Sequence, residues 1–259
     1  DTKKTILGFK FCLMLEIIIL SVIQGITEFI PVSSSSHLII VAHYLKFDNQ
    51  NLAIDVSLHI GSFFAVIFYF RKDIYKLVQN KDLFLKILFA SLPTLIIGYF
   101  LVKFNFIDQL RNIKIIGWTT IIFGILLFFS DKFNEKKNIE KSFNYKSALF
   151  IGLFQVLSLI SGVSRSGISI TAARFLNFNR VDSVKISFLL SIPTLAAVSF
   201  FGINNLITSN NLNLSILNIT SIVISFIFSL ITINYFLNFI KSFSLKIFVI
   251  YRILLGILI

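Results

Sequence analysis

The fold is decided by a polar interruption in an apolar run, which reads Gln24-Gly25-Ile26-Thr27-Glu28-Phe29-Ile30-Pro31-Val32-Ser33-Ser34-Ser35-Ser36-His37. The apolar run itself extends over residues 12–45. Pro31 ends a helix because proline has no backbone amide, and the serines after it are typical of the start of another helix. We therefore predict two half-length helices joined by a polar turn, as in a re-entrant hairpin that is buried within a membrane protein.

A second apolar region, residues 147–176, carries a similar interruption, Ser161-Gly162-Val163-Ser164-Arg165-Ser166-Gly167. Shifting the chain by 131 residues aligns the two regions without a gap. The shift superposes Gln24 on Gln155, Ser33 on Ser164, Ser35 on Ser166 and Phe47 on Phe178. Since 131 is close to half of the 259 residues, the pattern indicates a duplication in which each half contains one broken hairpin.

The composition of the chain is that of a membrane protein. Of its 259 residues, 56% are hydrophobic and only 14% are charged, whereas about 25% of the residues of a soluble domain are charged. Besides the two hairpins, six apolar runs reach or approach the roughly 20 residues that a helix needs to cross the hydrocarbon core. These predicted spans cover residues 52–70, 84–102, 115–130, 184–203, 216–240 and 246–259.

The predicted architecture is an all-α polytopic membrane protein with six transmembrane helices and two re-entrant helical hairpins. Residues 1–259 are expected to form a single integral membrane domain, made of two repeats over about 1–130 and 131–259. Each repeat contains three spans, an odd number, so the second repeat is inverted relative to the first. Inverted repeats of broken helices bring their hairpin tips together near the bilayer midplane.

Lysine and arginine residues predict the orientation of the chain. Of these residues, 15 fall in one set of connecting segments and 7 in the opposite set. The richer set is 71–86, 131–146, 174–185 and 241–246, and the poorer set is 1–10, 46–51, 103–114 and 204–215. Cytoplasmic loops are enriched in lysine and arginine, so we expect the richer set in the cytoplasm and both termini outside. Because the net charge of +12 is distributed in this way, it does not indicate a nucleic-acid-binding surface.

The first tip presents residue types that suit a catalytic site. Gln24 and Glu28 are four residues apart and share one helix face. Glu28 lies deep in an apolar run, where a carboxylate is costly and is a functional candidate by default. Ser34 and His37 are three residues apart on the first turn of the next helix, which suits a nucleophile and its base, or two phosphate ligands.

The second tip has the composition of an anion-binding cradle. Ser164, Ser166 and Ser169 carry hydroxyls, Arg165 offers a two-pronged donor for phosphate oxygens, and Gly167 lets a ligand approach the backbone. Both tips open helices, so two positive helix ends would converge on one spot. Such a spot, with a carboxylate, an imidazole and a guanidinium, suits phosphoryl transfer.

The same residues also fit roles without catalysis. A serine cluster before an apolar helix is most often only a cap. A buried carboxylate also occurs in transport and proton sites, so a secondary transporter or lipid-phosphate flippase is the alternative function, and a structural scaffold is a third. We expect Asp55 and His59, near the end of a span, to be packing or interface residues. Arg252 is expected to pair with a buried partner or to act directly.

The two tips resemble those of bacterial undecaprenyl-pyrophosphate phosphatases of the BacA/UppP type, and the resemblance covers most of the chain. Its strongest parts are the stretch from Gln24 to Ser34 with His37, and Gly162-Val163-Ser164-Arg165-Ser166-Gly167. Weaker support comes from Ser187-Phe188-Leu189-Leu190-Ser191-Ile192-Pro193 and from Ile250-Tyr251-Arg252. The resemblance implies an inner-membrane hydrolase that removes the terminal phosphate of undecaprenyl pyrophosphate, which recycles the lipid carrier of peptidoglycan synthesis and confers resistance to bacitracin when overproduced.

The resemblance also implies roles for individual residues, cofactors and partners. The implied catalytic residues are Glu28, Ser34, His37 and Arg165, and the implied ligands of the substrate phosphate are Ser33, Ser164, Arg165, Ser166, Gly167 and Ser169. The family uses a divalent cation, Mg²⁺ or Ca²⁺, for which Glu28 and Gln24 are the expected ligands, although many relatives have Glu in place of Gln24. The implied partners are a polyprenyl pyrophosphate and membrane lipids, no nucleic acid is expected, and a homodimer is the candidate assembly.

Two mechanisms fit this set of residues. In the first, Ser34 is the nucleophile and His37 is its base or a phosphate ligand. In the second, Glu28 or His37 activates a water molecule that attacks directly, and the sequence does not separate the two. In both, the serines and the arginine of the second tip would hold the distal phosphate and offset charge in the transition state.

Overall fold

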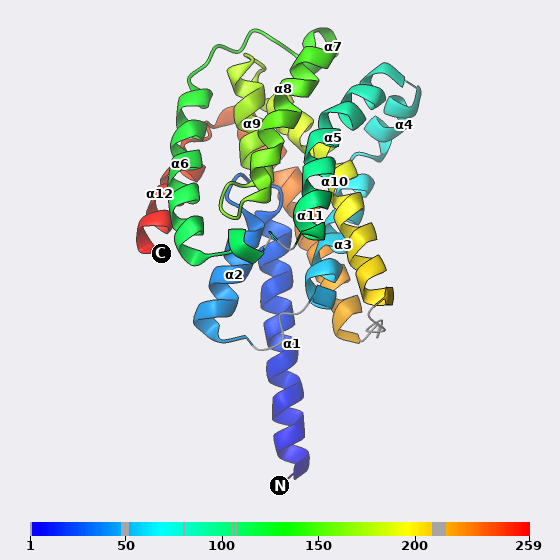
Figure 1. Cartoon of the computed structure of the whole chain (residues 1–259), viewed down its shortest axis with the longest axis vertical. Helices are drawn as coiled ribbons and strands as arrows, with labels where there is room; N and C mark the ends of the chain where they lie inside the picture. Colours follow the sequence, from blue (N-terminus) through cyan, green and yellow to red (C-terminus); the bar gives the residue numbers. More distant parts are fainter. Residues whose placement is uncertain (1, 48–51, 80, 105, 107, 209–215) are drawn as a thin grey trace.

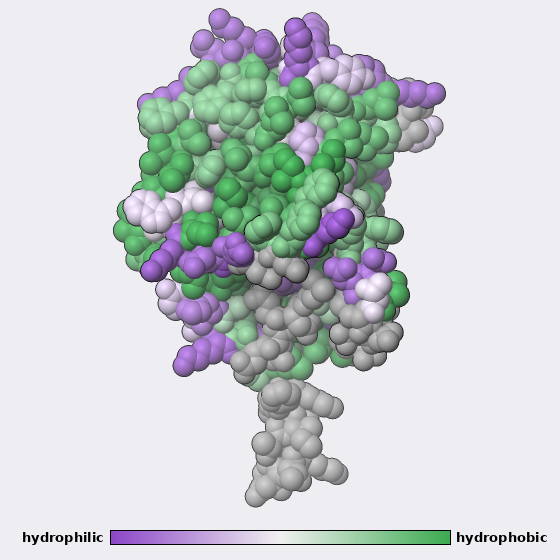
Figure 2. Space-filling view, in the orientation of Figure 1, coloured by the Kyte–Doolittle hydropathy of each residue, from purple (hydrophilic) through white to green (hydrophobic). Residues whose placement is uncertain are grey.

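The computed structural model describes residues 2–47, 52–79, 81–104, 106, 108–208 and 216–259. Within these ranges the chain is helical and forms no β-strand, which confirms the predicted all-α class. Four helices in the described chain are long and apolar enough to cross a bilayer, namely α5 (Lys81–Lys103), α6 (Ile113–Asp131), α10 (Arg180–Thr208) and α11 (Ile216–Ser242). Figure 2 shows a broad hydrophobic belt on the body, with hydrophilic side chains gathered toward its ends. The chain is a polytopic membrane protein.

The two other predicted spans are helices at the expected positions, but both have fewer than the roughly 20 residues that cross the hydrocarbon core. They are α3 (Leu52–Tyr69), with 18 residues, and α12 (Lys246–Leu258), with 13. At about 1.5 Å per residue, α12 rises roughly 20 Å, whereas the hydrocarbon core is about 30 Å thick. This helix by itself therefore covers only part of the bilayer.

Both interrupted regions form helical hairpins. The first consists of α1 (Thr2–Thr27) and α2 (Ser34–Leu45). The prediction of two half-length helices was wrong for α1, which has 26 residues because its helical conformation begins before the apolar run, whereas α2 has 12. The second consists of α8 (Tyr145–Val156), a single turn η2 (Leu157–Leu159) and α9 (Arg165–Phe175). Figure 1 shows α1 and α2 entering from the end of the molecule where the chain starts, while α8 and α9 enter from the opposite end. The two turns meet in the middle of the molecule, where hydrogen bonds join them.

The backbone supports the predicted duplication. Among the described residues, four that are not glycine have a positive φ: Ser33 (76°), Lys46 (53°), Ser164 (73°) and Asn177 (66°). They form two pairs, and the members of each pair are separated by the same 131 residues that align the sequences. Helix packing follows the same relation, because α1 lies against α11 while α8 lies against α5. An unusual conformation that recurs at one spacing is hard to explain without a repeat, since side chains disfavour it.

The four segments with the most lysine and arginine lie at one end of the molecule. Asp131, at the end of α6, bonds to Arg180 Nε at 2.6 Å and accepts from the amide of Leu245 at 3.2 Å. Lys185 is 2.9 Å from Asp73 in the short helix α4 (Arg71–Gln79). A second short helix, α7 (Ile139–Ser142), lies at the same end, as Figure 1 shows. These contacts connect all four segments that we expect in the cytoplasm, and the compartment itself stays a prediction.

The described parts of the segments with few basic residues lie at the opposite end. A single turn, η1 (Asp108–Leu110), connects α5 to α6 there. The predicted external loop 204–215 lies partly outside the described residues, which resume at Ile216.

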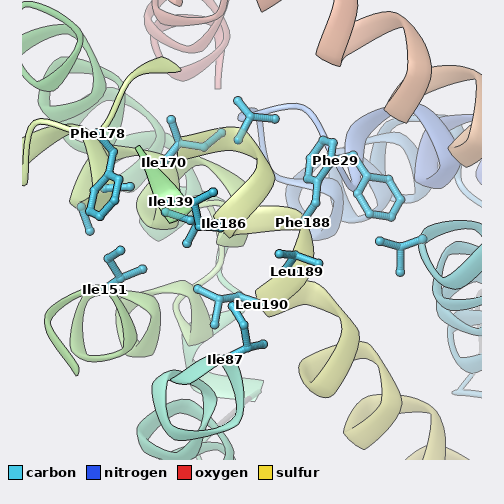
Figure 3. Packing of buried hydrophobic residues seen from close by; sticks show 14 of the residues in the cluster. Phe29, Ile87, Ile139, Ile151, Ile170, Phe178, Ile186, Phe188, Leu189 and Leu190 are labelled. Carbon is cyan, nitrogen blue, oxygen red and sulfur yellow. The ribbon is translucent and has the colours of Figure 1, made fainter. Parts of the chain in front are cut away.

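Aromatic packing fixes the first tip to the body. Phe29, within the turn of the first hairpin, is fully buried, and its ring meets that of Phe188 in α10 edge to face at 5.3 Å. Phe188 in turn contacts Phe70 and Phe236, which belong to the main buried cluster of Figure 3. Burial of one such ring stabilises the fold by about 1.5–3 kcal/mol. The polar residues around Phe29 therefore rest on a rigid apolar base.

Candidate active site

In each tip, the residue before the second helix is a serine with a positive φ angle. Ser33 precedes α2 with φ 76° and ψ 99°, and Ser164 precedes α9 with φ 73° and ψ 117°. The hydroxyl of Ser164 caps α9, because it accepts a hydrogen bond from the amide of Gly167 at 3.1 Å. The hydroxyl of Ser33 lies 2.9 Å from that of Ser36 instead. Both turns thus direct the start of a helix toward the middle of the molecule.

Glu28 is the centre of the site, and its side chain is only 7% exposed. Gln24 Nε2 donates to Oε2 of Glu28 at 3.0 Å, and the Ser34 hydroxyl donates to the same oxygen at 2.6 Å. The other carboxylate oxygen, Oε1, is 3.0 Å from Nη2 of Arg165. The structure therefore brings together the carboxylate and the guanidinium that are 137 residues apart in sequence.

Arg165 joins the two tips and α10. Its Nη1 donates to the carbonyl oxygen of Ser187 at 3.1 Å, while its Nη2 donates to Oε1 of Glu28 at 3.0 Å. Beside it, the Ser166 hydroxyl donates to the carbonyl oxygen of Ile30 at 2.8 Å and lies 3.1 Å from the hydroxyl of Ser164. A guanidinium and hydroxyls at the start of α9 form a site that favours an anion, since the free amides of a helix start add positive potential.

Ser34 and His37 have different partners, although the sequence suggests that they act as a pair. The hydroxyl of Ser34 donates to Glu28. The ring of His37 lies between the carbonyl oxygen of Ser33, 2.7 Å from Nδ1, and the hydroxyl of Tyr251, 2.6 Å from Nε2. The group placed to take a proton from Ser34 is therefore the carboxylate of Glu28.

Two predicted ligands of the phosphate lie deeper in the second hairpin. Ser169 is fully buried, and its hydroxyl donates to Oε1 of Gln155 at 3.3 Å. Gly167 is adjacent to a guanidinium, because a Cβ built at this position would lie 2.8 Å from Nη1 of Arg252. Ser169 thus links α9 to α8, and the absence of a side chain at Gly167 leaves room for Arg252.

Arg252 has a role that the sequence left open. This residue of α12 is fully buried, and its guanidinium bonds to backbone carbonyl oxygens of both tips. Nη1 is 3.3 Å from Pro31 O, and Nη2 is 2.8 Å from Gly162 O and 3.0 Å from Val163 O. Arg252 thereby holds the two turns against each other. The signals for it in the sequence are an arginine within a short apolar run and the weak family resemblance of Ile250-Tyr251-Arg252.

Three further residues, Ser187, Tyr251 and His59, form hydrogen bonds that the sequence did not predict. Ser187 and Tyr251 were not predicted as site residues, because the first supplies a backbone carbonyl and the second is one of seven tyrosines. His59, which we expected to be a packing residue, has Nδ1 2.8 Å from the carbonyl oxygen of Asp55, one turn earlier in α3.

The residues at Glu28 fit a divalent cation that binds together with a phosphate. Gln24 Oε1 is buried and has no hydrogen-bond partner in the described part of the chain, so one acceptor beside the carboxylate is available. The described residues contain no group of three or more acidic, histidine or cysteine side chains that could hold a metal alone. Mg²⁺ commonly uses one or two carboxylates and completes its shell with water and substrate phosphates.

Comparisons with known proteins identify the family of the chain. A family model described as "Bacitracin resistance protein BacA" matches residues 17–258, which include both tips. The undecaprenyl-diphosphatase of Pelagibacter ubique is 49% identical over 249 residues, covering 96% of this chain and 97% of that protein. The undecaprenyl-diphosphatase of Saccharophagus degradans is 41% identical, covering 94% of this chain and 96% of that protein. The chain belongs to the BacA family.

Proposed function

We propose that this protein hydrolyses undecaprenyl pyrophosphate to undecaprenyl phosphate and inorganic phosphate within the membrane. The observation that carries the proposal is the junction of the two tips, where Ser34, Glu28 and Arg165 form one chain of hydrogen bonds. At the junction, the Ser34 hydroxyl is the nucleophile, the Glu28 carboxylate is the base, and the Arg165 guanidinium is the positive group that binds phosphate. The relatives named above are named as diphosphatases, which favours hydrolysis over the transporter or flippase alternative.

The second tip binds the terminal phosphate. The hydroxyls of Ser164 and Ser166 and the guanidinium of Arg165 face the distal phosphoryl oxygens, and Gly167 lets the chain approach them. Phosphoryl transfer develops charge on these oxygens, so donors that are already in place stabilise the transition state. Ser33 and Ser169 support the two turns, and a direct contact of either one with phosphate stays a prediction.

The first tip supplies the attacking group. Oε2 of Glu28 accepts the proton of the Ser34 hydroxyl while Oγ bonds to the terminal phosphorus, and the bridging P–O bond breaks to release undecaprenyl phosphate. Water then attacks the phosphorus of the phosphoserine and the Oγ–P bond breaks. Glu28 returns its proton to Oγ of Ser34, and the water leaves one hydrogen in the released inorganic phosphate and gives the other to solvent. Direct attack by a water that Glu28 activates is the competing mechanism.

A divalent cation, Mg²⁺ or Ca²⁺, is part of the proposal. Glu28 and Oε1 of Gln24 would hold it together with oxygens of the substrate. The cation would supply positive charge against the pyrophosphate. Removal of divalent ions with a chelator should abolish phosphate release, and addition of Mg²⁺ or Ca²⁺ should restore it; unchanged release in the chelator would exclude the cation.

The location and assembly are also proposed. We assign the protein to the bacterial inner membrane, where the polyprenyl tail lies along the apolar surface between helices and the pyrophosphate reaches the tips from the external side. The homodimer expected from the sequence stays a prediction.

Phosphate release from a pyrophosphorylated polyprenol, measured with purified protein in detergent, tests the function. We expect release by the natural protein and its loss in Arg165→Ala and Ser34→Ala, both of which should elute as folded protein. Full turnover by Arg165→Ala would refute the site, whereas full turnover by Ser34→Ala would exclude Ser34 as the nucleophile. Rapid quenching followed by mass spectrometry should detect phosphate on Ser34, whereas a turnover without that adduct would establish direct attack by water.

A further inference from the structure

Tyr251 connects the last helix to the first tip. Its hydroxyl oxygen is 2.6 Å from Nε2 of His37, and the planes of the two rings lie within 10° of each other. The contact joins residues that are 214 positions apart, one in α12 and the other on the first turn of α2. Nothing in the mechanism above uses Tyr251.

The other nitrogen of the ring determines which group donates. Nδ1 of His37 is 2.7 Å from the carbonyl oxygen of Ser33, and a carbonyl oxygen can only accept a hydrogen bond. Nδ1 therefore carries a proton, and Nε2 of the neutral ring is an acceptor. Since Nε2 accepts, the hydroxyl of Tyr251 donates to it. The imidazole is thus held at both nitrogens.

The hydrogen bond from Nδ1 of His37 to the carbonyl oxygen of Ser33 is made to a strained part of the backbone. The peptide after Ser33 follows a residue with φ 76°, a conformation that is strained for a residue with a side chain. Its carbonyl oxygen accepts from Nδ1 of His37 and, at 3.3 Å, from the amide of the same residue. The nitrogen of that peptide belongs to Ser34, whose hydroxyl bonds to Glu28. Fixing the Ser33 carbonyl therefore fixes where Ser34 lies.

We propose that Tyr251 is a positioning residue that acts through His37. Its hydroxyl holds the imidazole, the imidazole holds the Ser33 carbonyl, and this chain of bonds keeps Ser34 against Glu28. The proposal rests on the function given above and adds a residue to the same site. It assigns His37 to support of the nucleophile, with the proton on Nδ1.

Substitution of Tyr251 by phenylalanine tests the effect on turnover, because it removes only the hydroxyl. We expect kcat to fall about tenfold, as for the loss of one hydrogen bond, while KM stays within about twofold because substrate binding is unaffected. Tyr235→Phe is the matched control, since this exposed tyrosine of α11 stacks on Phe239 away from the tips. Unchanged kcat in Tyr251→Phe would overturn the proposal.

A double-mutant cycle tests whether Tyr251 acts through His37. His37→Asn keeps an amide donor for the Ser33 carbonyl but removes the acceptor that Tyr251 uses. In this background Tyr251→Phe should cause no further loss, because the two residues form one chain. A second, independent tenfold loss in the double variant would show that Tyr251 acts elsewhere.

Nuclear magnetic resonance of ¹⁵N-labelled histidine separates this contact from the function. The chain has three histidines, and comparison with His37→Asn identifies the resonances of His37. We expect a proton on Nδ1 in the natural protein, and a shift of the Nε2 resonance alone in Tyr251→Phe. A proton on Nε2 would overturn the inference. The expected tautomer in a protein that releases no phosphate would refute the function and leave the contact intact.

Discussion

At the scale of single residues, Glu28 makes the contacts on which the site depends. Its two carboxylate oxygens accept hydrogen bonds from Gln24, Ser34 and Arg165, so both oxygens already have partners before substrate binds. In the proposed mechanism, phosphate must therefore compete with the carboxylate for the guanidinium of Arg165. This competition weakens binding of the product phosphate, since the carboxylate can retake the arginine.

Glu28→Gln tests the carboxylate without changing its shape. The amide cannot take the proton of Ser34 and cannot neutralise Arg165, so phosphate release should fall by about 10²–10⁴-fold. The control is Glu16→Gln, which changes a carboxylate within α1, 12 residues before Glu28 in the sequence. Kinetic assays of both variants in detergent check this expectation. Comparable rates for the two would rule out Glu28 as the base.

Some of these contacts could be predicted from the sequence, and others could not. Glu28 and Arg165 stand out because a charge at membrane depth requires a partner, so their association follows from the cost of burial. The partner of Ser34 depends on the direction of side chains within a turn, which spacing does not determine. The roles of Tyr251 and Arg252 depend on contacts across more than 200 residues, for which one sequence offers only the presence of a polar side chain.

At the scale of secondary structure, the tight turn at Gly162 allows the second tip to form. Gly162 has φ 95°, and a Cβ there would lie 2.0 Å from Thr119 Oγ1 and 2.9 Å from the carbonyl oxygen of Ile116. Gly162→Ala should therefore destabilise the protein by at least about 1–3 kcal/mol. Gly98→Ala is the control, because a Cβ there would meet Leu159 Cδ2 at an ordinary 3.5 Å. Thermal unfolding in detergent should show a lower midpoint for the first variant only.

The helix α12 should stabilise both hairpins through Arg252. In Arg252→Met the carbonyl groups of Pro31, Gly162 and Val163 lose their buried donor, which costs about 1–3 kcal/mol for each unsatisfied group. We expect a lower unfolding midpoint and faster proteolysis at the tips than in Arg111→Met, where the arginine is exposed. Equal midpoints for the two variants would show that the tips hold together without α12.

At the scale of the whole molecule, the ends of the helices were predicted well because membrane composition constrains them. The apolar runs predicted the positions of the six helices outside the hairpins, and the polar interruptions predicted the two hairpins. The length of α12 was predicted to within one residue, whereas the start of α1 at Thr2 was not predicted, because propensity sets helix ends only loosely. The repeat stays a prediction, which rests on one spacing that relates glutamine, serine and phenylalanine positions and is supported by positive φ angles with the same spacing.

The ionic end of the molecule predicts its orientation. Asp131, Arg180, Lys185 and Asp73 hold together the segments that we expect in the cytoplasm. After replacement of the single Cys12 by serine, a cysteine in place of Lys137 should react with an impermeant thiol reagent only in opened cells. A cysteine in place of Thr208, at the other end of α10, should react in intact cells. The reverse pattern would invert the topology and leave the site unchanged.

The short helix α12 also has a consequence for the lipid around the protein. A helix that rises roughly 20 Å beside others that span about 30 Å creates hydrophobic mismatch, which a bilayer relieves by thinning locally. Thinner lipid next to α12, where Tyr251 is exposed, would shorten the distance that a charged headgroup must travel to reach the hairpin tips. In vesicles of phosphatidylcholine with longer acyl chains, this deformation becomes more costly. Turnover should therefore decline as the chains lengthen, with no change in amino-acid sequence, and a constant rate across chain lengths would show that the protein does not sense the bilayer in this way.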